Sequence, residues 1–312
     1  MPLNPQNWGM CTVSTEKGHR GREIDLFTQE EKYMERKVQQ KVQGFRTQDG
    51  AGVSLVRVLG HGTVEEYDPI LMLDSFDSIN PDEYTAGFPM HPHRGIETIS
   101  YVYRGQMTHR DSLGNSDTIA DGEVQWMTAG SGILHEEMLP ASERMLGVQL
   151  WLNLPAKDKL CPPAYHSIKN AEIEEIPLEN GKLRLLAGEY EGRKGYVGNY
   201  LPLDYYDIHL NAGASVVIST EDTRSVMIFT LLGSAAVGGE PIQEKTAVKL
   251  TAGSHVEIKA GAENAQVLFV SSVPLDESVA WGGPIVMNTK AELQKAFDDL
   301  DRGTFLQKEI AY

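Results

Sequence analysis

The chain has 312 residues, with 44 acidic and 28 basic side chains, a formal net charge of −16 and a pI of about 5.0. This acidic balance excludes direct binding to nucleic acid, which needs a basic surface, and it opposes docking on anionic membranes. The length is enough for one large hydrophobic core or two ordinary ones.

The sequence contains no targeting or redox motif. No apolar run is long enough to span a bilayer, and Met1 to Arg20 lack the apolar centre of a signal peptide. The two cysteines, Cys11 and Cys161, form neither a C-x-x-C motif nor a disulfide framework. We therefore expect a protein of the reducing cytoplasm, or also of the nucleus if its source is eukaryotic.

Residues 1–43 are expected to form an N-terminal extension. Pro2 and Pro5 disfavour early regular structure. The stretch from Asp25 to Gln43 is rich in Glu, Lys and Gln, and its apolar positions are sparse. A surface helix and a solvated arm both fit this composition, and we prefer the solvated arm.

Short strands are expected from Val53 onward. The segments are β-branched or apolar, and Gly, Asn and Asp residues separate them. This pattern predicts a β-sandwich or β-barrel. The expected strands of this half are residues 53–59, 70–76, 98–103, 107–111, 123–127, 133–137 and 145–152.

Two pairs of potential metal ligands lie within this region, His91 with His93 and His135 with Glu137. Residues two apart on a strand point to the same face, so two facing strands would aim four ligands at one point. Three imidazoles and one carboxylate suit a redox-capable divalent ion such as iron, manganese, copper or nickel. The alternative is that these histidines are surface residues or hydrogen-bonded core residues. Pro92 cannot donate to a strand ladder, so it indicates a strand start or edge.

The second half repeats the strand pattern after a proline-rich linker at residues 155–163. A helix is expected after Pro284, because Thr289 and Glu292 form a capping box and Gly303 can end the helix. The expected strands of this half are residues 183–186, 206–210, 215–219, 226–231, 247–250, 255–259 and 266–270.

A short internal sequence repeat indicates duplication of the β unit. The sequence Thr-Ala-Gly-Ser at residues 128–131 recurs at residues 251–254. Aligning the two copies places Ile258 at the position of His135. Counting back from Gly105 in the first copy and from Gly233 in the second places Ser219 and Glu221 at the positions of His91 and His93. The second copy is therefore expected to have lost the metal site.

Three segments resemble the pirin family of the cupin superfamily. They are HPHRGIET at 91–98, QWMTAGSGILHEEM at 125–138 and GPIVMNT at 283–289, and the resemblance covers about residues 51–312. It implies an all-β fold of two stacked cupin, or jelly-roll, β-barrels with a C-terminal helix. The expected domains are an N-terminal extension (1–43), a metal-binding barrel (44–160) and a metal-free barrel plus helix (161–312).

The resemblance also implies a set of site residues. His91, His93, His135 and Glu137 would hold one divalent transition metal per chain, with Fe(II) expected and Mn, Ni, Cu or Zn as alternatives. We expect Glu137 to be catalytic as well, taking the proton of the substrate hydroxyl.

Further side chains near these motifs are candidates for the substrate pocket. They are Asp74, Phe76, Phe88 and Glu97. Glu97 stands where many other cupins place a ligand, but the pirin pattern does not use it as one, so a purely structural role is equally acceptable. Trp126 is expected to pack in the core, and His109 is expected to be solvated.

The resemblance leaves two functions open. Some pirins resemble quercetin 2,3-dioxygenases, which open flavonols with O2, and others are metal-dependent regulators that bind transcription factors or metabolic enzymes. We expect an enzyme with a flavonol-like aromatic substrate and O2. The alternatives are a metal- or redox-dependent adaptor with a protein partner, and a structural cupin with an incidental metal.

Overall fold

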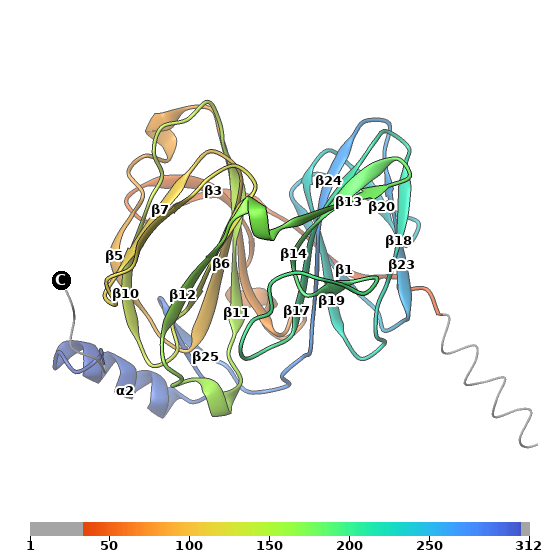
Figure 1. The fold of residues 1–312 in the computed structure, drawn as a ribbon. Coiled ribbons are helices and arrows are strands. Elements are labelled where there is room, and N and C mark those ends of the chain that lie inside the picture. The colour runs from red at the N-terminus through yellow and green to blue at the C-terminus, as the bar shows by residue number, and fades with distance from the viewer. Residues whose placement is uncertain (1–33, 307–312) are drawn as a thin grey trace, which may run out of the picture.

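Two lobes of β-structure lie side by side in the computed structural model, which describes residues 34–306 (Figure 1). Strands dominate both lobes, and α2 (Lys290–Asp301) is the one α-helix in the described residues. The predicted all-β class with a C-terminal helix is therefore confirmed. Among the described residues, no helix has the length and apolar character needed to cross a membrane.

The N lobe is built from a seven-stranded sheet and a four-stranded sheet, both antiparallel. The large sheet has the order β12 (Ala164–Ile168), β9 (Glu123–Thr128), β6 (Ile96–Arg104), β11 (Met145–Asn153), β4 (Ile70–Ser78), β3 (Val53–Leu59), β2 (Phe45–Asp49). The small sheet has the order β5 (Phe88–His93), β10 (Ile133–Met138), β7 (Met107–Asp111), β8 (Ser116–Ile119). All seven strands predicted for this half are present.

The C lobe repeats this arrangement of one large and one small sheet. The large sheet has the order β1 (Val38–Gln43), β22 (Thr246–Leu250), β19 (Ser225–Leu232), β24 (Ala265–Ser272), β17 (Leu203–Leu210), β14 (Gly181–Ala187), β13 (Glu174–Leu178). The small sheet has the order β18 (Ser215–Ser219), β23 (His255–Ala260), β20 (Ala235–Val237), β21 (Glu240–Ile242). The seven strands predicted for this half are also present.

Shorter elements connect these sheets. Two hairpins are formed by β15 (Glu189–Tyr190) with β16 (Arg193–Lys194), and by β25 (Ala280–Gly282) with β26 (Ile285–Met287). Single 3-10 turns are η2 (His61–Thr63), η3 (Pro81–Glu83), η4 (Ala156–Asp158) and η5 (Asn170–Glu172).

The equal strand orders support the predicted duplication, but they correct its alignment. In the N lobe, His91 pairs with His135 across β5 and β10. In the C lobe, Ile258 pairs with Val216 across β23 and β18, and Ile218 lies two residues further along β18. The counterparts of His91 and His93 are therefore Val216 and Ile218, and the placement of Ser219 and Glu221 there was wrong. The C-lobe positions are apolar, so they offer no metal ligand.

The two large sheets pack face to face, and their facing side chains form the largest hydrophobic cluster of the described residues. Tyr101 and Trp126 enter it from the N lobe, and Tyr205 and Phe229 enter it from the C lobe. Separate clusters fill the interior of each lobe. Both faces of β6 and β11 are consequently buried, one against the lobe interior and one against the other lobe.

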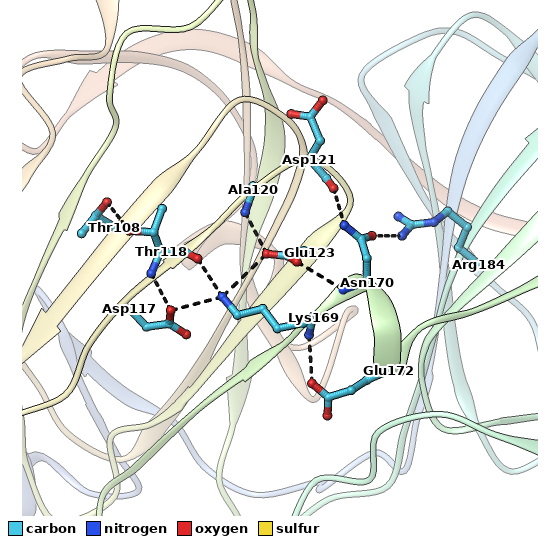
Figure 2. A network of polar contacts seen from close by, with 10 residues as sticks. All are labelled: Thr108, Asp117, Thr118, Ala120, Asp121, Glu123, Lys169, Asn170, Glu172 and Arg184. Atoms are coloured by element: carbon cyan, nitrogen blue, oxygen red, sulfur yellow. Dashed lines mark hydrogen bonds and ion pairs between the residues drawn. The ribbon is translucent and has the colours of Figure 1, made fainter.

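A polar network closes one side of this interface (Figure 2). Lys169 donates to the Thr118 carbonyl at 2.7 Å and contacts the carboxylates of Asp117 and Glu123 at 3.2 and 3.7 Å. Asn170, on η5, accepts from Arg184 of β14 at 2.7 Å and donates to the Asp121 carbonyl at 2.9 Å. The segment after the linker thus ties the N lobe to the C lobe.

Each lobe takes one edge strand from the other side of the predicted domain boundaries. β1 precedes residue 44 yet pairs with β22 of the C lobe, and β12 follows residue 160 yet pairs with β9 of the N lobe. Residues 38–43 form a paired strand, so both the preferred solvated arm and the alternative helix were wrong for them, and residues 1–33 lie outside the described part. We keep 44–160 and 161–312 as the proposed domains, except that β1 joins the C lobe, β12 joins the N lobe, and the segment from β26 through α2 packs on the N lobe.

The chain returns to the N lobe at its C-terminal end, where α2 lies below that lobe (Figure 1). Val286 packs in the same hydrophobic cluster as Ile96 and Ile133. Arg94 donates to Asp299 at 2.8 Å and to the Phe305 carbonyl at 2.9 Å. The predicted capping box of Thr289 and the predicted helix are confirmed.

Candidate metal centre

The ligand pairs lie on two neighbouring strands of the small sheet in the N lobe. β5 is the edge strand of this sheet, as the proline between His91 and His93 predicted. It pairs with β10, where His135 stands directly opposite His91. The alternation of a strand places residues 91 and 93 on one face and residues 135 and 137 on one face.

Three imidazole rings converge between these strands. The Nε2 atom of His91 lies 3.0 Å from Nε2 of His93 and 3.1 Å from Nε2 of His135. The Nδ1 atoms of His91 and His93 lie 2.8 and 2.9 Å from the carbonyl oxygens of Pro89 and Pro284. A carbonyl oxygen can only accept, so in both neutral rings Nδ1 carries the proton and Nε2 keeps its lone pair.

This geometry fits a bound cation. Two Nε2 lone pairs that face each other cannot form a hydrogen bond, and a positive ion between them removes the conflict. Nitrogen atoms 3.0 Å apart subtend an angle of about 90° at an ion whose metal–nitrogen distances are about 2.1 Å. The set of His91, His93 and His135 is therefore suited to a divalent metal, with room on the ion for further ligands.

Burial keeps the rings of His93 and His135 neutral, which is the form that binds a metal. Desolvation, with a smaller contribution from the neighbouring His91, lowers the pKa of His93 to about 3. Desolvation also lowers the pKa of His135 well below its ordinary value, helped by the other histidines. Protons therefore compete weakly for these two rings at neutral pH.

Glu137 lies next to the cluster, although its carboxylate is not within the group of ligand atoms that lie within 4.8 Å of one another. Its Oε1 accepts hydrogen bonds from Gln125 and, at 3.4 Å, from Ser100. Its Oε2 accepts one from Gln149 at 2.8 Å. The Gln149 amide is itself oriented by Trp151 Nε1, which donates to its oxygen at 3.2 Å. A ligand role for Glu137 stays a prediction.

A cavity of about 540 Å³ opens on this centre. His91, His93 and Glu137 line it, as do the predicted Asp74, Phe76 and Phe88. Trp151 and Trp281 also line it, with ring centroids 5.6 Å apart. His61 stacks on Trp281 at 3.9 Å. The cavity thus combines aromatic rings with polar and charged side chains, which is typical of a small-molecule site.

One ion-pair group forms the polar wall of the cavity. Arg57 donates to both carboxylate oxygens of Asp74, at 3.0 and 2.7 Å, and contacts Asp49 at 2.6 Å. Burial raises the pKa of Asp74 even though Arg57 favours its ionised form. The carboxylates of Asp74 and Asp49 raise the pKa of Arg57, so the guanidinium stays protonated.

Glu97 does not belong to this cavity, and we correct its assignment. It lies on β6 three residues before Ser100, whose hydroxyl contacts Glu137, so strand alternation directs Glu97 to the opposite face. There it is buried, accepts from the Thr128 hydroxyl at 2.6 Å, and has its pKa raised by desolvation. Trp126 packs in the inter-lobe core, as predicted.

His109 is buried, so the expectation of a solvated side chain was wrong. It has no exposed surface, it stacks on Tyr165 with ring centroids 4.1 Å apart, and it lies beside His135. The sequence analysis also missed Gln125, Gln149 and Trp151 around Glu137. Side chains alternate between the two faces of a strand, and this alternation places polar residues of β7, β9 and β11 on the interior face with the ligands. That pattern is the signal that would have found them.

Comparison with known proteins agrees with this architecture. The Pirin family model matches residues 29–152, and the Pirin C-terminal cupin domain model matches residues 205–306. A Pseudomonas aeruginosa protein with the provisional name quercetin 2,3-dioxygenase is 40% identical over 270 residues, covering 83% of this chain and 94% of its own. A pirin-like protein of Caulobacter vibrioides is 39% identical over 85% of this chain and 97% of its own.

Solved structures show the same relationship. The crystal structure of a quercetin 2,3-dioxygenase from Acinetobacter baumannii superposes with a TM-score of 0.81 and 33% sequence identity, and the match covers 87% of this chain and 99% of that chain. The match therefore extends over nearly the whole of that chain, and the two family models fall one in each half of this sequence. The chain belongs to the pirin family of cupin proteins.

Proposed function

We propose that the chain is a metal-dependent dioxygenase that opens flavonols such as quercetin with O2, with the metal held by His91, His93, His135 and Glu137. The observation that carries the proposal is the cavity of about 540 Å³ that is lined by aromatic rings together with His91, His93 and Glu137. The names of the Pseudomonas and Acinetobacter relatives support the same activity. Fe(II) is the expected ion, and Mn, Ni, Cu or Zn are the alternatives, because imidazole and carboxylate ligands accept most first-row metals.

The walls of the cavity would bind and orient the substrate. A flavonol is a flat aromatic molecule, and Phe76, Phe88, Trp151 and Trp281 offer ring faces and edges on which it can stack. This packing excludes water and turns the hydroxylated edge of the substrate toward the histidine cluster. When bound, the metal supplies Lewis acidity that lowers the pKa of the substrate hydroxyl, together with a place for O2 to react.

Glu137 would accept the hydroxyl proton. A carboxylate offers about four lone-pair positions in all, and Oε1 already accepts from two donors, whereas Oε2 accepts from one. Oε2 therefore has one position left, which can serve the metal or the proton but not both at once. The amide groups of Gln125 and Gln149 hold the carboxylate in place while it takes up and later returns that proton.

Loss of the visible absorption band of quercetin tests the proposal. The protein loaded in turn with each of the five metals is incubated with quercetin and O2, with chelated protein as the blank. We expect turnover with at least one ion, its loss in His93→Gln, and its retention in the matched control His255→Gln on β23 of the C lobe. No turnover with any ion would overturn the proposal and favour the adaptor role, for which redox-dependent capture of a protein partner is the corresponding assay.

A further inference from the structure

The third ligand, His135, differs from the other two in how its ring is held. His91 and His93 each face a carbonyl oxygen through Nδ1, whereas Nδ1 of His135 lies 3.4 Å from Nδ1 of another imidazole, that of His109. Either nitrogen of an imidazole can donate or accept, so this contact alone does not fix which Nδ1 carries the proton. The answer depends on what holds His109.

Asp111 decides the proton position on His109. Residues 109 and 111 share one face of β7, and Nε2 of His109 lies 2.8 Å from Oδ2 of Asp111. The same carboxylate accepts from the side chain of Asn115 at 2.9 Å and from the backbone N–H groups of Leu113 and Asn115 at 2.8 and 3.1 Å. Three hydrogen bonds from groups other than His109 favour the ionised carboxylate, which can only accept, so Nε2 of His109 is the donor.

The proton position on His109 in turn determines the proton position on His135. With Nε2 of His109 donating to Asp111, Nδ1 of His109 is the nitrogen left to accept from Nδ1–H of His135. The proton of His135 is thereby held on Nδ1, and its Nε2 keeps the lone pair that faces His91 at 3.1 Å. The chain of contacts therefore runs from a carboxylate through one imidazole to the ligand imidazole.

Packing holds His109 in this position. Its ring is fully buried and lies parallel to the ring of Tyr165 on β12, with an interplanar angle of 9° and centroids 4.1 Å apart. The ring therefore cannot turn without breaking both the stack and the Asp111 contact. His109 is not a member of the three-histidine cluster, so its role is toward His135 rather than toward the ion.

We infer that His109 and Asp111 are positioning residues that fix the proton of His135 on Nδ1 and present its Nε2 to the metal. The inference rests on the proposed metal site but not on flavonol turnover. A partner of this kind orients the ligand ring and raises its basicity, and its removal typically weakens metal binding by about 10- to 100-fold.

Nickel affinity tests the inference without any enzyme assay. His109→Phe keeps a flat ring beside Tyr165 but removes both nitrogens, and we expect its Kd for Ni(II) to rise by about 10- to 100-fold. His166→Phe is the control, because His166, on β12, also stacks on a tyrosine, Tyr196, at 4.9 Å and 12°, but lies outside the metal site. Its Kd should stay within twofold of the unmodified protein.

Two further measurements keep the inference falsifiable if His109→Phe does not fold, as judged by circular dichroism. Asp111→Asn preserves the volume and removes the charge, and it should weaken Ni(II) binding by about tenfold. Nitrogen NMR of histidine-labelled, metal-free protein should find the proton of His135 on Nδ1 and that of His109 on Nε2. A folded His109→Phe protein with unchanged Ni(II) affinity, or a His135 proton on Nε2, would overturn the inference. If His109→Phe binds Ni(II) with unchanged affinity and the unmodified protein turns over a flavonol, the inference fails and the proposed function stands. If His109→Phe binds Ni(II) more weakly and the unmodified protein has no turnover, the proposed function fails and the positioning role of His109 and Asp111 stands.

Discussion

Replacing Glu137 with Gln separates the two roles proposed for this side chain. The carboxylate accepts from Gln125 on one oxygen and from Gln149 on the other. The new amide brings an NH2 group, so one of the two glutamines must turn. Gln149 is held by Trp151, whereas the oxygen of Gln125 has no partner among the described residues. Gln125 is therefore the residue that turns, and its oxygen accepts from the new NH2 group.

The structure sets the size of the expected effects. Hydrogen bonds to a charged acceptor contribute roughly 1.5–3 kcal/mol, and those to a neutral one contribute roughly 0.5–1.5 kcal/mol. Two such bonds weaken, so the free energy of unfolding should fall by about 1–3 kcal/mol and leave the protein folded. The amide oxygen cannot take up the hydroxyl proton, so turnover at full metal occupancy should fall by about 100- to 10,000-fold.

The assay is quercetin turnover at matched metal content, with occupancy measured by elemental analysis on the same samples. Glu136→Gln is the control, because it removes the same charge from the neighbouring position of β10, where the side chain pairs with Arg110 at 2.5 Å. We expect that variant to keep its turnover. Turnover of Glu137→Gln close to that of the unmodified protein, at equal occupancy, would refute the proton-transfer role and leave Glu137 at most a ligand.

Four further results are expected. Elemental analysis should find one tightly bound ion per chain, since the described residues contain one cluster of three potential ligands; two ions would contradict this. Chelation should leave the far-UV circular dichroism intact, because each lobe has its own apolar core; cooperative unfolding on chelation would show the reverse. The metal-free protein should lose stability as the pH falls below 6.5, because the pKa of His93 is lowered to about 3 and the unfolded chain then binds the extra proton. At pH 5 this amounts to about 2 kcal/mol, measurable by urea unfolding, and His93→Gln should have a shallower pH dependence. Arg94→Ala should cost about 3 kcal/mol in the same assay, because it removes a buried guanidinium that donates to the Ser131 and Phe305 carbonyls and to Asp299, whereas Arg302→Ala, at an exposed pair, should cost about 0.5 kcal/mol or less.

Local geometry explains what could be predicted from the sequence. The spacing of His91 and His93 places both side chains on one face of a strand, so the pairing could be predicted without knowing the rest of the fold. The capping box of α2 is local in the same way. Strands with turn residues at both ends were found wherever an apolar pattern marked them.

Tertiary contacts explain what could not be predicted. Both faces of β6 are buried, so its sequence has no polar side that would have assigned Glu97 to the inter-lobe face. His109 and Asp111 are polar residues on the buried face of β7, and their pattern resembles that of an exposed strand. β1 has few apolar residues because it covers a sheet edge, and only its pairing with β22, about 200 residues later, makes it a strand.

The exchange of chain segments between the lobes links events at the two ends of the protein. His93 is oriented by the carbonyl oxygen of Pro284, and this residue is reached only after the chain has completed the C lobe. A fragment that ends at residue 160 would therefore lack both this acceptor and the strand β12 that carries Tyr165. By thermodynamic linkage, any ion that prefers the oriented His93 also stabilises the docking of residues 280–306 on the N lobe. Metal binding in the N lobe and docking of residues 280–306 on that lobe are thus coupled, so a change in one shifts the other.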